Sequence, residues 1–255
     1  MSTATYLYCL VESAEAPPLD DAPQGLADAG APRLLAVGEG LWLVAASAPL
    51  ATYGPGEIEA HLEDLSWVSD RALAHEALVE HFGGARAVLP LKLFTLFSSD
   101  DRAVADVRSR EAEVRRALDR VAGRREWGVR ARWGAERARA LAAEKGGSHR
   151  PASGRAFLER KRLLRDTGRA PSPEATAAVE SAFAALAAGA DEARRHAPVP
   201  GGTLLLDAAF LVPLEGEDAF RESVEAAARE LEAVACDLVL TGPWPPYNFA
   251  GGETP

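Results

Sequence analysis

Apolar runs in the first hundred residues predict strands joined by a hairpin and by helices. Residues 6–11 are apolar throughout, as expected of a strand buried on both faces. The runs 34–37 and 41–45 flank a Gly-Glu-Gly turn, and this arrangement predicts a hairpin. Pro90 interrupts the run 88–97 and cannot donate a hydrogen bond to a neighbouring strand. We therefore expect this strand to be bent or to lie at a sheet edge.

Helical spacing of apolar residues fills the stretch before that strand. Ile58, Leu62 and Leu65 begin the pattern, and a second helix is predicted from about Ser69. Its side chains expected to face the core are Leu73, Leu78, Val79 and Phe82. The order of strand, hairpin, helices and strand suits an antiparallel sheet with helices on one face. We expect a ferredoxin-like α+β domain over residues 1–98.

The clearest helical pattern lies in residues 98–123. Its apolar positions form a narrow seam that includes one polar member, Glu111: Val104, Val107, Val114, Leu118 and Val121. Ser99 is placed to cap the N-terminus, and arginines gather at the other end, where they complement the helix dipole. The pattern predicts one continuous helix whose seam faces the core, with a seam for a partner helix as the alternative.

Residues 126–133 alternate between apolar and polar positions, which predicts a half-buried strand. Trp127 and Trp133 share its apolar face, whereas Arg130 and Arg132 lie on a basic outer face. This outer face suits an acidic partner or neighbouring carboxylates as counter-charges.

The remaining residues predict a second domain over 99–255, whose pattern alone fits the α+β class or the α/β class. Residues 146–154 form the most loop-like segment of the chain. Helices are expected at 135–145, through Phe157, Lys161 and Leu164, at about 171–196, and at 217–234. Strands are expected at 203–212 and 236–240, with the last strand ended by Gly242 and Pro243.

Three aromatic residues follow the last strand: Trp244, Tyr247 and Phe249. Two prolines separate the first two rings and restrict the backbone, so the rings are held on a stiff segment. One interpretation is that the rings close a core. The other is that some of them form a recognition surface, because rigid aromatic side chains are favoured interface anchors.

The sequence LTGPWPPYNF resembles the C-terminal signature of the gas vesicle accessory proteins of the GvpL/GvpF family. Four more stretches resemble that family in the same order: YLYCLVE, VLPLKLFTLFSS, GRREWGVRARW and GRAFLERKR. The resemblance covers nearly the whole chain. It implies two domains related to the ferredoxin fold, the second with extra helices.

Composition limits the classes of partner. The chain has 255 residues, of which 47% are hydrophobic, and this content is ample for a packed core. A net charge of -10 disfavours a general nucleic-acid binder and adsorption to anionic lipid. The start of the chain lacks the features of a secretory signal, and no apolar run reaches membrane-spanning length. We expect a soluble, cytoplasmic protein with Cys9 and Cys236 as buried free thiols.

Motifs for catalysis or cofactor binding do not emerge from the sequence. It contains neither a phosphate-binding glycine motif nor a GxSxG nucleophile elbow. The five histidines lack the spacing of metal ligands, and an apolar strand around Cys9 opposes thiolate formation. We therefore expect no enzyme, and no metal, nucleotide or other cofactor.

The resemblance implies a non-enzymatic accessory protein associated with gas vesicles. Its partners would be the hydrophobic shell protein, bound in a chaperone-like manner to support assembly, and other gas vesicle accessory proteins. A minor vesicle component is a variant of this hypothesis. The candidate partner-binding residues are Trp244, Tyr247 and Phe249, supported by Trp127 and Trp133. The alternative is a small-molecule-binding sensor or enzyme on a ferredoxin-like scaffold, which an enclosed polar pocket would favour.

Overall fold

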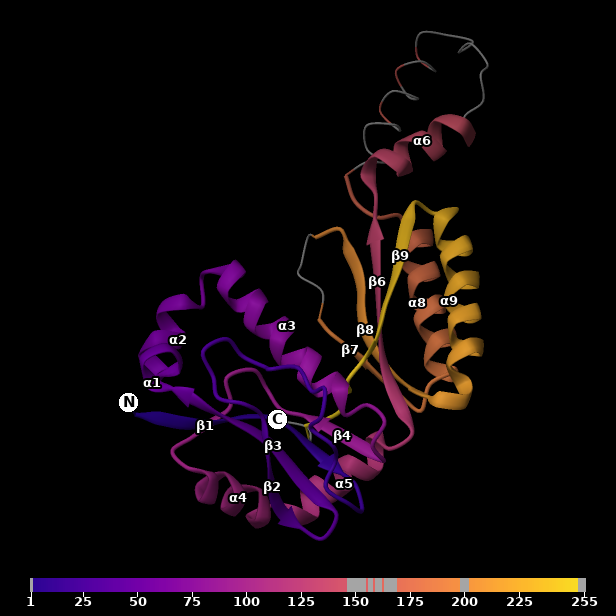
Figure 1. The fold of residues 1–255 in the computed structure, drawn as a ribbon. Helices are drawn as coiled ribbons and strands as arrows, with labels where there is room; N and C mark the ends of the chain where they lie inside the picture. The colour runs from indigo at the N-terminus through magenta and orange to yellow at the C-terminus, as the bar shows by residue number, and fades with distance from the viewer. Residues whose placement is uncertain are drawn as a thin grey trace. The chain divides into compact units, whose positions relative to one another are not determined.

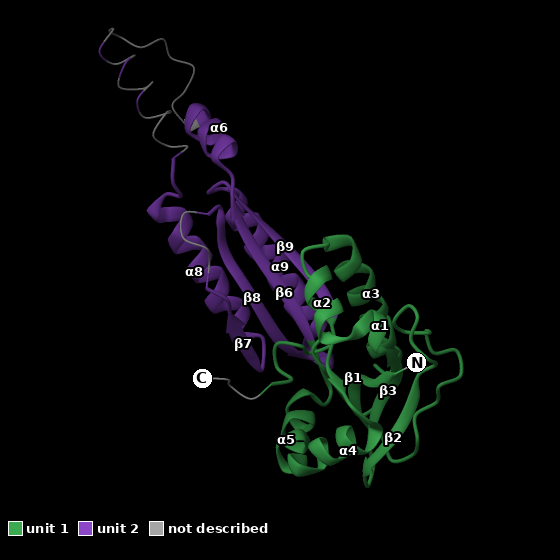
Figure 2. Cartoon of the chain, turned by 90° about the vertical axis from the view of Figure 1, so that its left-hand side faces the viewer, with its two compact units in different colours: residues 1–125, 244–255 green, residues 126–243 purple. Residues whose placement is uncertain are grey.

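The computed structural model describes residues 2–145, 155, 158, 162, 169–197 and 202–251. The chain forms two compact units (Figure 2). Unit 1 comprises residues 1–125 and 244–255, and unit 2 comprises residues 126–243. Each unit contains a sheet, helices and its own apolar core, so the expected α+β class is confirmed.

The described part of unit 1 contains a five-stranded sheet (Figure 1). Its strands are β1 (Thr3–Glu12), β2 (Arg33–Gly38), β3 (Leu41–Pro49), β4 (Ala87–Pro90) and β5 (Leu96–Phe97). The order is β2-β3-β1-β4, with β5 also paired to β1, and these pairs are antiparallel. The hairpin and the edge position of β4 confirm two predictions. Gly40 has a φ of 65° in the hairpin turn, where glycine meets no steric penalty.

Helices cover both faces of this sheet, whereas the sequence predicted helices on one face. The helices of unit 1 are α1 (Leu50–Tyr53), α2 (Pro55–His61), α3 (Leu65–His81), α4 (Asp100–Ser109) and α5 (Glu111–Val121). Helix α3 packs against β1, while α4 contacts β2 and α5 contacts β4 from the opposite side (Figure 1). The face under α3 is built around Tyr6, Tyr8, Leu78, Val79 and Phe82.

Residues 98–123 form two helices, so the prediction of one continuous helix is wrong. The break lies at Arg110, whose φ of -118° and ψ of 20° are not helical. Ser99 caps α4 as expected, because its Oγ accepts a hydrogen bond from the amide of Arg102. The apolar seam faces the core, where Val107 and Leu118 are buried. Since both helices cover unit 1, the division of the chain falls after Arg125 instead of at Ser99.

The described part of unit 2 contains a four-stranded sheet of order β7-β8-β6-β9. Its strands are β6 (Arg124–Trp133), β7 (Glu192–Arg195), β8 (Leu204–Pro213) and β9 (Cys236–Trp244). Its helices within the described residues are α6 (Ala135–Lys145), α8 (Pro173–Ala188), the 3-10 turn η1 (Leu214–Gly216) and α9 (Glu217–Glu232). Helices α8 and α9 pack against each other and against β8, and they cover one face of the sheet.

Two boundaries in unit 2 differ from the predictions. The helix expected to reach His196 ends before Gly189, and residues 192–195 form β7, which pairs antiparallel with β8. The last strand continues through Gly242 and Pro243 to Trp244. Proline is compatible with this position because β9 is an edge strand. The expected loop at 146–154 lies outside the described residues, as does most of the helix expected through Phe157, Lys161 and Leu164.

Candidate partner-binding site

The C-terminal aromatic segment folds into a turn after β9. The amide of Tyr247 donates to the carbonyl of Pro245 at 2.7 Å, and the amide of Phe249 donates to the carbonyl of Pro246 at 3.1 Å. The amide of Ala250 donates to the same Pro246 carbonyl at 2.9 Å. These bonds close the backbone of the segment into a turn.

The three aromatic residues of the segment differ in how far they are buried. Phe249 is fully buried, whereas Trp244 is 38% exposed and Tyr247 is 36% exposed. The ring of Tyr247 lies 6.5 Å from the ring of His75 on α3, measured between centroids. Phe249 is therefore the buried ring of the segment, and Trp244 and Tyr247 are its exposed rings.

A buried aromatic cluster lies next to this segment. The ring centroids of Tyr6 and Tyr8 on β1 are 4.8 Å apart, and each ring also lies beside His75. The Tyr6 hydroxyl lies 2.6 Å from Nδ1 of His75 and accepts a hydrogen bond from the amide of Phe94. The Tyr8 hydroxyl accepts from the amide of Leu26 at 3.0 Å.

Burial sets the charge states in this cluster. It lowers the pKa of His75 to about 4, and the nearby backbone of Leu91 opposes the shift only in part. Burial raises the pKa of Tyr8 to about 12 and the pKa of Tyr6 still further. At neutral pH His75 is therefore uncharged, and its Nδ1 shares a hydrogen bond with the Tyr6 hydroxyl. The cluster is a hydrogen-bonded core that holds β1 to α3.

The two remaining candidate residues lie in the core of unit 2. Trp127 and Trp133 are each 6% exposed, and both face α8 and α9 through the same side of β6. The indole nitrogen of Trp127 donates to Oε1 of Glu217 at 3.1 Å. These rings fill the core as the alternation of β6 predicted, and they present little surface to a partner.

Comparison of the sequence with models of known protein families identifies the family of the chain. The model of the family described as "Gas vesicle synthesis protein GvpL/GvpF" matches residues 4–251. The chain belongs to the GvpL/GvpF family. The resemblance found in its motifs is thereby confirmed.

One curated relative of this GvpL/GvpF chain is "Gas vesicle protein L" of Streptomyces sp. (strain CB03234). The two are 32% identical over 227 residues, which cover 86% of this chain and 83% of the relative. The crystal structure of GvpF from Anabaena sp. PCC7120 matches with a TM-score of 0.71 at 21% identity, covering 99% of this chain and 98% of that one. GvpF from Microcystis aeruginosa matches with a TM-score of 0.66 at 16% identity, covering 97% and 99%. These two structures support the fold.

Exposed leucines are a feature of this GvpL/GvpF chain that the sequence predictions missed. Leu62, Leu65 and Leu73 are 53%, 80% and 64% exposed, although Leu73 was expected to face the core. Helical geometry explains the error, since Leu73 precedes the buried Leu78 by five residues and therefore points about 140° away from it. The apolar residues of α3 are spread around the helix, so the sequence periodicity does not mark which side of it is buried.

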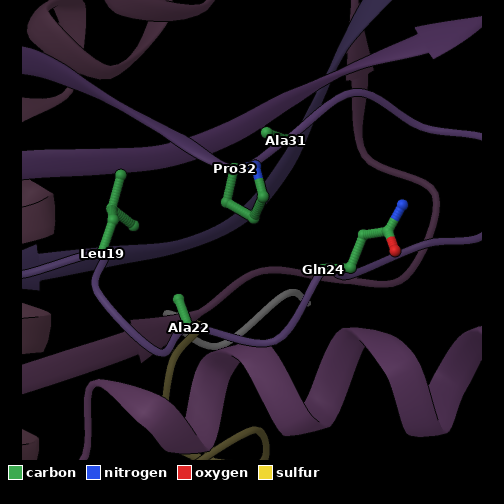
Figure 3. A pocket seen from close by; sticks show the side chains of 5 residues that line it. All are labelled: Leu19, Ala22, Gln24, Ala31 and Pro32. Atoms are coloured by element: carbon green, nitrogen blue, oxygen red, sulfur yellow. The ribbon is translucent and has the colours of Figure 1, made fainter.

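A pocket of about 350 Å³ lies along the loop that follows β1 (Figure 3). It is lined by Leu19, Ala22, Gln24, Ala31 and Pro32. The Gln24 amide is the polar side chain of this set, and no ionisable side chain belongs to it. The side chains that line the pocket therefore comprise one amide and four apolar groups.

The ionisable groups of the described residues bear on three features: a metal site, a reactive thiol and an ion pair. No group of three or more His, Cys, Asp or Glu side chains in this part of the chain is arranged to hold a metal. Cys9 and Cys236 are free and buried as predicted, and burial raises the pKa of each thiol. On the outer face of β6, Arg130 donates to Asp207 at 3.1 Å, so a carboxylate is its counter-charge. No helix among the described residues combines the length and apolarity required to cross a membrane.

Proposed function

We propose that this GvpL/GvpF-family protein is a non-enzymatic accessory factor that binds the hydrophobic shell protein and supports gas vesicle assembly. One observation carries the proposal: Trp244 and Tyr247 expose more than a third of their surface on a segment that is anchored by the buried Phe249. A turn with three backbone hydrogen bonds fixes this segment. Fixed aromatic rings lose little entropy on binding, which makes them effective anchors.

The chemistry of the shell protein supports this assignment. Its subunits bury an apolar face in the finished wall, and before assembly that face promotes aggregation. A binder with a net charge of -10 that covers the face would keep the complex dispersed through charge repulsion. We place this activity in the cytoplasm at the growing vesicle, where other accessory proteins are available as further partners.

A small-molecule sensor or enzyme is the competing hypothesis. The pocket beside Gln24 does not favour it, because its lining combines one amide with apolar side chains. Specific recognition of a polar metabolite or acid–base catalysis requires several polar groups that converge on the ligand. A metabolite retained through purification would favour this hypothesis.

The test is co-purification with the shell protein. We expect the tagged wild-type chain to shift the shell protein from the aggregated to the dispersed fraction without added nucleotide. The double substitution Trp244→Ala/Tyr247→Ala should weaken this association at least about tenfold, as expected when two interface anchors are removed.

Leu214→Ala is the matched control, because Leu214 is 47% exposed in η1 of unit 2. It should bind as the wild type does. If the wild-type chain leaves the shell protein aggregated, the shell-binding role is wrong. If the wild type binds and the double variant binds equally well while both remain folded, the role stands and this site is wrong.

A further inference from the structure

The outward side of α3 carries a continuous ridge of exposed positions. Leu65, Ser69, Leu73 and Ala77 follow one another at steps of four, so they form one ridge along the helix, which we call the α3 ridge. Leu65 is 80% exposed and Leu73 is 64% exposed. Leu62, directly before the helix, is 53% exposed and extends the apolar surface.

The opposite side of α3 is fixed in the core of unit 1. Leu78, Val79 and His75 are buried there, and the side chain of Asp64 caps the helix by accepting from the amides of Ser66 and Trp67. Because the helix is held on its inner side and at its N-terminus, the outer ridge is preorganised. A partner that docks on it would order little additional backbone.

The two helices that contain and precede the α3 ridge are rich in carboxylates. Residues 55–81, which span α2 and α3, contain seven Asp or Glu residues, one Arg and no Lys. Arg71, the single Arg, stacks on the ring of Trp67 at 4.3 Å from its centroid. Burial and the charge of Glu80 raise the pKa of Glu76, so the carboxylates on this side repel one another. A cationic partner would relieve that repulsion.

The charge of the ridge selects among possible occupants. A second copy of α3 would bring like charges together, and an anionic lipid surface would be repelled in the same way. An amphipathic helix with basic flanks would contact the leucines through its apolar face and pair with the carboxylates through its flanks. The ridge from residue 65 to 77 is about 18 Å long at 1.5 Å per residue, which matches a partner helix of three to four turns.

We propose that the α3 ridge is a second docking surface for the shell protein, which binds through an amphipathic helix flanked by Lys or Arg. This inference rests on the proposed shell-binding function and assigns to it a surface distinct from Trp244 and Tyr247. The leucines supply apolar contact, and Glu76 and Glu80 supply charge complementarity that orients the partner helix.

The first experiment measures binding of the shell protein to Leu65→Ser/Leu73→Ser, with Leu214→Ser as the matched control. We expect the double variant to lose about tenfold or more in affinity and to retain its thermal transition, because both side chains are exposed. Glu76→Gln/Glu80→Gln should weaken binding less and flatten its dependence on salt concentration.

The second experiment uses synthetic helical peptides of about four turns with a leucine face. One peptide carries Lys flanks and the other carries Glu flanks. The wild-type chain should prefer the Lys peptide, and Leu65→Ser/Leu73→Ser should lose that preference. Binding of the Lys peptide without binding of the shell protein would refute the proposed function and the shell protein as occupant of the ridge, and would leave the ridge as a surface for a different basic amphipathic helix.

Three outcomes overturn the inference itself. One is equal affinity of Leu65→Ser/Leu73→Ser and the wild type for the shell protein. Another is no preference between the two peptides. The third is concentration-dependent self-association in sedimentation that Leu65→Ser/Leu73→Ser abolishes, which would assign the ridge to a second copy of the chain.

Discussion

His75 makes the stability of unit 1 depend on pH between neutral and mildly acidic conditions. Burial lowers its pKa from 6.5 to about 4 in the folded chain, so the folded state resists protonation that the unfolded chain accepts. The contribution of the neutral His75 side chain to stability is therefore fully present above pH 6.5. It is lost as the pH falls from 6.5 towards 4, because over this interval only the unfolded state binds the proton.

The size of the loss follows from the two pKa values. Each pH unit over which only the unfolded chain is protonated costs about 1.4 kcal/mol. Between pH 7 and pH 5 the effective interval is about one and a half units, which predicts a loss of about 2 kcal/mol. A loss of this size is a large fraction of a typical free energy of unfolding.

The perturbation that isolates this effect is His75→Asn. The Asn amide oxygen retains an acceptor for the Tyr6 hydroxyl, which lies 2.6 Å from Nδ1 of His75, but it does not titrate. Hydrogen exchange of β1 amides at pH 7 and pH 5, corrected for intrinsic rates, measures the opening free energy of unit 1. Between pH 7 and pH 5, the opening free energy of the variant should fall by about 2 kcal/mol less than that of the wild type.

His196→Asn is the control, because His196 is exposed in unit 2. It should keep the wild-type pH dependence in unit 1. An NMR titration of the imidazole signals provides a direct check. If His75 titrates near 6.5, or if wild type and His75→Asn lose equal free energy on acidification, a buried neutral imidazole is the wrong description.

Two further predictions concern the packing of each unit. Phe249→Ala should destabilise unit 1 by about 3–5 kcal/mol, because the ring is fully buried, whereas Tyr247→Ala should cost about 1 kcal/mol or less; a urea titration that finds equal costs would contradict this contrast. Gly128→Ala should destabilise unit 2 by about 1–3 kcal/mol, because a Cβ there would lie 2.6 Å from Oγ1 of Thr241. Adding Thr241→Ala should restore most of that loss, and a thermal melt without rescue would rule out this contact as the cause.

The sequence by itself determined the elements that can be identified from residues close together in the chain. Alternation assigned Trp127 and Trp133 to the covered face of β6, because a strand with one face against helices exposes only every second side chain. A glycine turn between two apolar runs determined the β2–β3 hairpin. The ordered motifs identified the family and therefore the two-domain α+β fold.

Only tertiary structure decided where several of these elements end and which side chains remain exposed. β7 has no apolar alternation, and it exists because its backbone pairs with β8. Leu73 lies outside because the position of α3 on β1 is set by Leu78 and Val79. The turn at Pro245–Ala250 leaves Phe249 buried and its neighbours Trp244 and Tyr247 exposed. Burial depends on contacts between residues distant in the chain, and local sequence patterns do not contain those contacts.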